Sequence, residues 1–263
     1  MAIGIVRKKF MHCFYTEKEN IGSDKVQIYG SDVNHIKNVL RMEVGEEITV
    51  CDGEGTFFQC KLQELLSDVI VAEILEEKEA ETELKVRITL FQGLPKKDKM
   101  ELIIQKAVEL GVDEIIPVAT RFCVAKIEDG KKEKKKLERW QAISEAAAKQ
   151  SGRGRIPEIK PVMTYKEALK LGSQMECCMI PYEKAEGMQA FKQLLTDCGK
   201  FPAGSHIGIF IGPEGGFDEK EIEAALEAKV QPVSLGKRIL RTETAGLCVL
   251  SALMLELEAV EQC

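Results

Sequence analysis

The sequence predicts an α/β protein in which a small β-barrel domain precedes a larger domain built on a mainly parallel sheet. At 263 residues the chain exceeds the roughly 100–200 residues usual for a single domain, so two domains are expected. Short strand-like runs fill the first part, whereas apolar strands alternate with helices in the second. Such alternation is typical of a parallel sheet covered by helices.

The first domain is expected over residues 11–76, after an N-terminal extension at residues 1–10. Turn signals at Asp52-Gly53 and Glu54-Gly55 separate strand-like runs, and one helix is expected at residues 32–41. The predicted strands cover residues 10–15, 26–29, 47–51, 56–65 and 69–75. Six glutamates against one lysine between residues 73 and 83 favour an acidic linker at residues 77–83.

The second domain is expected over residues 84–263, with Ile- and Val-rich strands at residues 84–92, 113–119, 176–182, 205–212 and 230–235. A helix after Asp98 would bury Leu102, Ile103, Ala107 and Leu110 and end at a glycine, Gly111. Ligands of open parallel sheets bind beyond the carboxyl ends of the strands. The loops after residues 182, 211 and 235 are therefore the candidate binding loops.

The last helix, predicted at residues 242–260, is apolar nearly all round in its first half. A helix without a polar face is expected to be buried on all sides. In a domain of this size, a second subunit would cover one of those sides.

The net charge of −6 argues against indiscriminate coating of nucleic acid, which requires many accumulated Lys and Arg residues. Local basic patches at residues 7–9, 96–99 and 131–139 leave specific RNA binding open, although a solvated helix face is the simpler interpretation of the last one.

Nine cysteines without a Cys-x-x-Cys pair or a histidine at ligand spacing predict reduced thiols and no metal site. No apolar run approaches the roughly 18 residues of a membrane span, and the first ten residues do not have the order of charges of a secretory signal. We therefore expect a cytoplasmic protein that neither enters nor binds a membrane.

Two glycine-containing loops carry the functional prediction. The strand at residues 206–211 runs into Gly212-Pro213-Glu214-Gly215-Gly216, whose backbone is free to lie against a flat ligand such as adenine. Its pattern is neither a dinucleotide fingerprint nor a Walker motif. In the second loop, residues 234–245, Arg238 and Arg241 bracket an apolar pair, an arrangement that suits a base and an anionic backbone. Taken singly, each loop is also explained as a structural turn.

The two loops read Gly212-Pro213-Glu214-Gly215-Gly216 and Leu235-Gly236-Lys237-Arg238-Ile239-Leu240-Arg241-Thr242-Glu243-Thr244-Ala245. Together they resemble the paired signature of the 16S ribosomal RNA uridine N3-methyltransferases, of the RsmE type, in the SPOUT superfamily. Upstream, residues 105–112, 150–153, 157–159 and 38–41 agree, so the similarity covers nearly the whole chain from Met11.

The resemblance implies a trefoil-knotted methyltransferase domain, one of the rare exceptions to unknotted topology, and a PUA-like barrel that binds RNA. It also implies S-adenosyl-L-methionine as cofactor, 16S rRNA in the 30S subunit as substrate, and a homodimer formed through the last helix. The implied cofactor-binding residues are Pro181, Tyr182, Glu183, Ile211, Gly212, Pro213, Glu214, Gly215, Gly216, Leu235, Gly236, Arg238, Ile239, Leu240, Arg241, Thr244 and Ala245. Cys13 and the Arg121-Phe122-Cys123 segment depart from the family pattern and affect the expected RNA contacts only.

Four residues are candidates for catalysis. Arg153 or Arg241 is expected to stabilise negative charge on the base or its phosphate, and Glu214 or Glu243 to hold the cofactor or accept a proton. The alternatives are a related methyltransferase with another RNA target and a non-catalytic RNA-binding protein. Nucleotide hydrolysis is excluded because the sequence lacks a Walker lysine and metal-binding carboxylates.

Overall fold

The computed structural model describes residues 13–123, 130–185 and 187–261. The chain divides into two units. Unit 1 contains the residues up to 83 together with residues 148–156, and unit 2 contains residues 84–147 and the residues from 157 onwards. Each unit is described by itself.

Unit 1 is a curved five-stranded sheet in the order β1-β3-β4-β5-β2. Its strands are β1 (Cys13–Tyr15), β2 (Lys25–Tyr29), β3 (Glu47–Cys51), β4 (Thr56–Leu65) and β5 (Val69–Glu79). β1 and β3 pair in parallel and the other neighbours are antiparallel. Strand alternation follows the predicted pattern: Val26 and Ile28 are buried, whereas Lys25, Gln27 and Tyr29 are exposed. This sheet confirms the β-rich first domain.

The predicted helix at residues 32–41 is instead a four-residue helix, α2 (Ser31–Asn34), followed by a π-helical turn, η2 (His35–Val39). Val33 and Ile36 are the residues that this segment buries. A short 3-10 helix, η1 (Lys18–Asn20), connects β1 with β2.

The boundaries of unit 1 differ from those predicted. Strand β5 continues to Glu79, so the first three residues of the expected acidic linker are paired β-structure. Residues 148–156 also belong to this unit: Ile156 N donates to Gly53 O at 3.1 Å, and Cys51 Sγ donates to Gly154 O at 3.2 Å. Only glycine fits at Gly154, because a Cβ there would lie 2.2 Å from the Cβ of Ala80. The periodicity of a sequence does not reveal such a distant partner.

Unit 2 contains a parallel sheet in the order β12-β10-β11-β6-β7-β8, with β9 pairing to β7. Its strands are β6 (Arg87–Gly93), β7 (Glu114–Ala119), β8 (Glu158–Ile159), β9 (Met163–Thr164), β10 (Cys177–Pro181), β11 (His206–Ile211) and β12 (Gln231–Val233). The five predicted strands are present. The two-residue strands β8 and β9 are too short to be recognised from periodicity.

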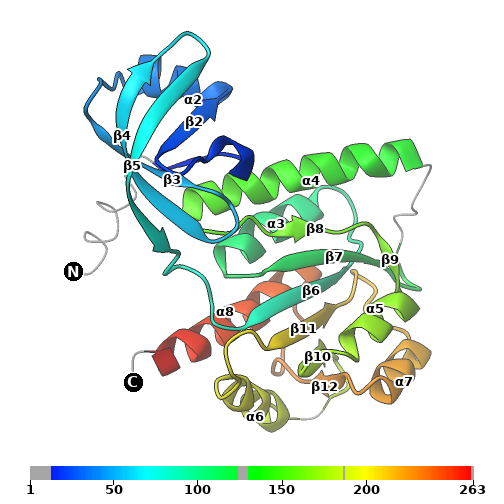
Figure 1. Ribbon diagram of the computed structural model, residues 1–263. Coiled ribbons are helices and arrows are strands. Elements are labelled where there is room, and N and C mark those ends of the chain that lie inside the picture. The colour runs from blue at the N-terminus through cyan, green and yellow to red at the C-terminus, as the bar shows by residue number, and fades with distance from the viewer. Residues whose placement is uncertain (1–12, 124–129, 186, 262–263) are drawn as a thin grey trace. The chain divides into compact units, whose positions relative to one another are not determined.

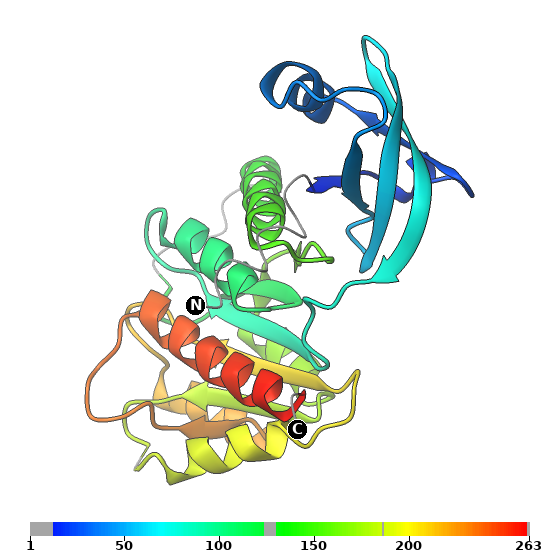
Figure 2. The ribbon, with the colours of Figure 1, turned by 90° about the vertical axis from the view of Figure 1, so that its left-hand side faces the viewer.

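Helices cover both faces of this sheet. They are α3 (Lys99–Glu109), α4 (Gly130–Ser151), α5 (Tyr165–Gly172), α6 (Gln189–Cys198), α7 (Glu219–Glu227) and α8 (Thr242–Glu261). Helices α3, α6 and α8 lie on one face, and α5 and α7 on the other (Figure 1, Figure 2). Between α5, α7 and the sheet, Phe91 and Phe210 stack with their ring centroids 4.3 Å apart.

Helix α3 buries a different face from the one predicted. Leu102 is 45% exposed, whereas Met100, Ile103, Ile104, Ala107 and Val108 are buried. These five positions follow the three-and-four spacing of a helical face, which the predicted set did not.

Helix α8 is buried on one side only in the single chain. Val249, Leu250 and Leu253 have no exposed surface, but Leu255 is 64% exposed and Cys248 is also exposed. The sequence predicted that this helix is buried on all sides. In the structure of one chain, part of its apolar surface is instead open to solvent.

None of the helices in the described ranges is long and apolar enough to cross a membrane. Among those same residues, no cluster of His, Cys, Asp and Glu could hold a metal ion. The eight cysteines that the structure describes are free thiols; Cys263 and the basic residues 7–9 lie outside the described residues.

Candidate functional site

Unit 2 contains a cavity of about 410 Å³ at the carboxyl ends of β10, β11 and β12, where the topology of a parallel sheet places ligands. Its volume lies within the roughly 300–1,000 Å³ range of small-molecule sites. Its walls are Lys99, Pro181, Tyr182, Glu183, Ile211, Gly212, Pro213, Glu214, Gly216, Phe217, Ser234, Leu235, Gly236, Lys237, Arg238, Ile239, Leu240, Arg241, Thr242 and Ala245.

Fifteen of the seventeen residues expected to bind the cofactor line this cavity; Gly215 and Thr244 are not among its walls. The seventeen did not include Lys99, Phe217, Ser234, Lys237 and Thr242, although Ser234, Lys237 and Thr242 lie within the second predicted loop. For Lys99 the available signal was its place at the start of a helix that follows a parallel strand, since such positions face the ligand edge of the sheet.

The loop after β11 is a tight backbone turn. Gly216 N donates to Pro213 O at 3.0 Å, and Gly216 has a φ of 68°, which favours glycine. Gly93, at the end of the neighbouring strand β6, touches this loop so closely that a Cβ would lie 2.7 Å from Pro213 Cδ. Asp218 and Glu221 then form a capping box that starts α7. The loop is therefore fixed at both ends.

The loop after β12 combines a glycine of positive φ with an exposed apolar residue. Gly236 has a φ of 110°, and its N–H donates to Ser234 Oγ at 3.3 Å. Ile239 is 90% exposed, while its neighbour Leu240 is partly buried. This loop presents both backbone groups and apolar side chains to the cavity.

Thr242, the first residue of α8, joins the cavity loops. Its hydroxyl donates to Gly212 O at 2.6 Å and accepts a hydrogen bond from Gln92 Nε2 at 3.0 Å. Gln92 is fully buried at the end of β6. The side chain of Thr242 thus holds the start of α8 against the glycine loop.

A lysine and two carboxylates stand at one side of the cavity. Lys99 Nζ lies 3.1 Å from Glu214 Oε1 and 3.2 Å from Glu243 Oε2. The hydrogen bond to Glu214 is the main cause that raises the pKa of Lys99 above its ordinary value. Partial burial works to raise the pKa of Glu214, but N–H donors at its own backbone and at Lys96, with the Lys99 ammonium, outweigh it and lower that pKa. Both groups are therefore charged at neutral pH.

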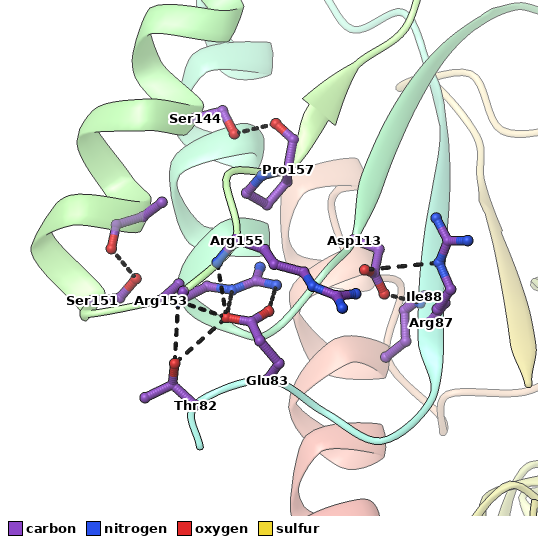
Figure 3. A network of polar contacts seen from close by, with 12 residues as sticks. Thr82, Glu83, Arg87, Ile88, Asp113, Ser144, Ser151, Arg153, Arg155 and Pro157 are labelled. Carbon is purple, nitrogen blue, oxygen red and sulfur yellow. Dashed lines mark hydrogen bonds and ion pairs between the residues drawn. The ribbon is translucent and has the colours of Figure 1, made fainter. Parts of the chain in front are cut away.

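Of the four predicted catalytic residues, Glu214 and Arg241 line the cavity, and Glu243 touches it through Lys99. Arg153 does not belong to the cavity walls. Its side chain is 5% exposed, belongs to unit 1 and forms an ion pair with Glu83 (Figure 3). Within unit 1 the charge of Arg153 is balanced by Glu83, and its catalytic role stays a prediction.

The cavity walls fit a nucleoside-type cofactor. Gly216 and Gly236 leave backbone groups accessible, and Ile211, Leu235 and Leu240 supply apolar surface for a flat ring. Polar and charged side chains alternate with this apolar surface along the walls, as suits a cofactor that has both a flat ring and charged groups.

The RNA methyltransferase domain model matches residues 82–254, and the RNA methyltransferase PUA domain model matches residues 28–75. The chain belongs to the RNA methyltransferase family. The RNA methyltransferase match covers the whole cavity, which favours an enzyme over a protein that only binds RNA.

Individual relatives agree with this RNA methyltransferase assignment. The chain is 38% identical over 231 residues to the ribosomal RNA small subunit methyltransferase E of Bacillus subtilis, covering 88% of this chain and 90% of that protein. The crystal structure of the enzyme of that name from Neisseria gonorrhoeae, bound to S-adenosyl methionine, is similar with a TM-score of 0.75 at 36% identity, covering 92% and 95% of the two chains. A Legionella pneumophila methyltransferase structure with the same cofactor has a TM-score of 0.76 at 30% identity, covering 92% and 96%.

Proposed function

We propose that this protein transfers a methyl group from S-adenosyl-L-methionine to N3 of a uridine in 16S rRNA within the 30S subunit. The observation that carries the proposal is the 410 Å³ cavity whose walls contain fifteen of the seventeen expected cofactor residues. The kinship with small subunit methyltransferases supports the choice of RNA. Since ribosomal subunits are cytoplasmic in bacteria, the proposed place of action is the cytoplasm.

The residues of the cavity have distinct parts in this proposal. The glycine loops hold the adenosine by backbone hydrogen bonds, and Ile211, Leu235 and Leu240 exclude water around it. When bound, the cofactor supplies a methyl group already activated by a sulfonium. The protein then contributes mainly alignment of the base and stabilisation of the charge that N3 gains on losing its proton.

Arg241 is exposed at the cavity wall, where its guanidinium is positioned to neutralise a phosphate or the developing charge on the uracil. Glu214, kept ionised by its N–H donors and Lys99, is suited to orient the cofactor. The same contacts lower its pKa and weaken it as a base; Glu243 is the second candidate for accepting the proton. Arg153 stays a second candidate, after Arg241, for this charge stabilisation, and its ion pair with Glu83 also stabilises unit 1.

Primer extension on 16S rRNA tests the proposed reaction, because a methyl on N3 blocks Watson-Crick pairing and stops reverse transcriptase. RNA from a strain without this gene should lose one stop, and the parent gene should restore it. A variant with Arg241→Ala is expected to restore it poorly, whereas Arg87→Ala, an exposed arginine at the start of β6, should restore it fully. Persistence of every stop in the deletion strain would refute the proposed target.

We also propose that unit 2 contains the trefoil knot that the family resemblance implies. A second proposal from that resemblance is a homodimer formed through α8. The exposed apolar residues of α8, among them Leu255, support a partner on this helix. Leu255→Glu should shift the protein from dimer to monomer in sedimentation velocity. Leu226→Glu, at a similarly exposed position of α7, should leave the dimer intact. A parent protein that sediments as a monomer at micromolar concentration would contradict this arrangement.

A further inference from the structure

The loop after β7 is fixed by polar contacts that do not involve the ring of its aromatic residue, Phe122. Arg121 N donates to Glu221 Oε1 at 2.9 Å, and Arg121 Nη1 lies 2.9 Å from Asp218 Oδ1. Cys123 N donates to Thr120 O at 3.1 Å and closes the turn. The loop is therefore anchored on the start of α7 through its backbone and its arginine.

Phe122 stands beside the glycine loop of the cavity. A Cβ placed on Gly215 would lie 2.8 Å from the Cβ of Phe122, so the two residues are in direct contact. Phe122 nevertheless remains 42% exposed, and the Arg121 guanidinium carbon lies 6.0 Å from the centre of its ring. Neither Phe122 nor Gly215 lines the cavity, so the ring is on its rim.

Basic side chains lie near this rim, together with the carboxylates of Glu214, Asp218 and Glu221. Lys96 and Lys97 are exposed, and the backbone N–H of Lys96 donates to Glu214, the neighbour of Gly215. Arg238 is an exposed wall residue of the same cavity. An exposed aromatic ring with an arginine beside it and lysines nearby is the arrangement with which proteins bind unpaired nucleotides, through stacking and phosphate contacts.

We propose that Phe122 stacks on an unpaired base that neighbours the target nucleotide in the RNA strand, with Arg121 beside it. The neighbouring base is favoured over the target itself because Phe122 is outside the cavity in which the methyl donor would sit. A nucleotide whose base enters an enzyme pocket leaves its stack, and the bases next to it lose a stacking partner. Phe122 replaces that partner. This inference rests on the proposed function, methylation of 16S rRNA.

The test compares Phe122→Leu, which keeps apolar contact with Gly215 but cannot stack, with Phe122→Trp, which can. Steady-state methylation of 30S subunits from the deletion strain gives kcat and KM, and calorimetry gives the Kd for S-adenosyl-L-methionine. Phe122→Leu should raise the KM for 30S subunits roughly 5- to 150-fold, the usual loss for one base-aromatic stack. Its kcat and cofactor Kd should stay within about twofold of the parent, and Phe122→Trp should keep the parent KM. Leu226→Ala, which removes another exposed apolar side chain of unit 2, serves as the control.

Two results would overturn the stacking role. The first is that Phe122→Leu has the same KM for 30S subunits as the parent. The second is that Phe122→Leu loses as much affinity for the cofactor as for 30S subunits, which would mean that Phe122 supports the glycine loop. Binding of a single-stranded oligouridylate, measured without methyl transfer, separates this inference from the proposed function. If the parent does not methylate 30S subunits but Phe122→Leu still weakens oligouridylate binding, the target is wrong and the stacking site stands. If the binding is also unchanged, the stacking site is refuted.

Discussion

Glu83→Ala is expected to lower the free energy of unfolding of unit 1 by about 3–5 kcal/mol, the usual cost of leaving one partner of a buried ion pair alone. The side chains of Glu83 and Arg153 are 14% and 5% exposed, so solvent screens them little. The Glu83 carboxylate also accepts hydrogen bonds from Gly154 N at 2.9 Å and from Arg155 N at 3.3 Å. All of these donors would lose this acceptor together.

At about 4–8 °C per kcal/mol for a domain of this size, the melting midpoint of unit 1 should fall by at least roughly 10 °C. Calorimetry and circular dichroism in urea would measure this loss. Fluorescence of Trp140, the single tryptophan of the chain and a residue of unit 2, follows the other unit separately. Glu19→Ala, an exposed glutamate of unit 1, is the matched control and should change the midpoint little.

A double-mutant cycle decides whether the pair itself is responsible. Glu83→Met with Arg153→Met should be more stable than either single variant, because no uncompensated charge remains buried. Strictly additive losses, or single variants that unfold at the parent urea midpoint, would refute the reasoning and reopen a role for Arg153 outside unit 1.

Three further outcomes follow from the cavity and the core. Gly236→Ala should raise the cofactor Kd roughly 5- to 150-fold in calorimetry, because a φ of 110° strains any residue with a Cβ at this cavity wall. Gly204→Ala, at a φ of 86° but outside the cavity walls, should leave the Kd unchanged; equal affinities of the two variants would contradict this. Lys99→Met should lower kcat/KM for methyl transfer about 10- to 100-fold, because the carboxylates of Glu214 and Glu243 would lose the cation that they share. The control, Lys106→Met, lies further along α3 and should have no effect on methyl transfer. Burial raises the pKa of the Cys60 thiol to about 12, so this thiol keeps its proton at pH 8. Iodoacetamide should therefore label Cys60 only after unfolding. Complete labelling of Cys60 in the folded protein at pH 8, measured by mass spectrometry, would refute this.

The sequence predicted the elements of each unit well where a local pattern carried the information. Strands β3 and β4 have the bounds expected from residue type and turn signals, because strand alternation and Asp-Gly turns act over a few residues. The buried face of α3 was predicted less well. Its sequence is apolar at many neighbouring positions, and only packing selects Ile104 over Leu102.

The candidate site shows the same division between local and distant information. Glycine loops after strands were visible as short motifs, and fifteen of the seventeen residues expected there line the cavity. Lys99 comes from a helix more than a hundred residues before Glu214 and Glu243, so no spacing rule brings these three charges together. The ion pair of Arg153 with Glu83 was not predicted for the same reason, because these two residues are brought together only in three dimensions.

The return of residues 148–156 to unit 1 has a consequence for synthesis on the ribosome. A growing chain that has reached Glu83 already contains all five strands of that unit, but it lacks Arg153 and the segment that pairs with Gly53. Some seventy more residues must emerge before the carboxylate of Glu83 meets its cation, and closing so long a loop has an entropic cost. Unit 1 therefore finishes folding only after much of unit 2 has been translated, although domains more often fold in the order in which they are made.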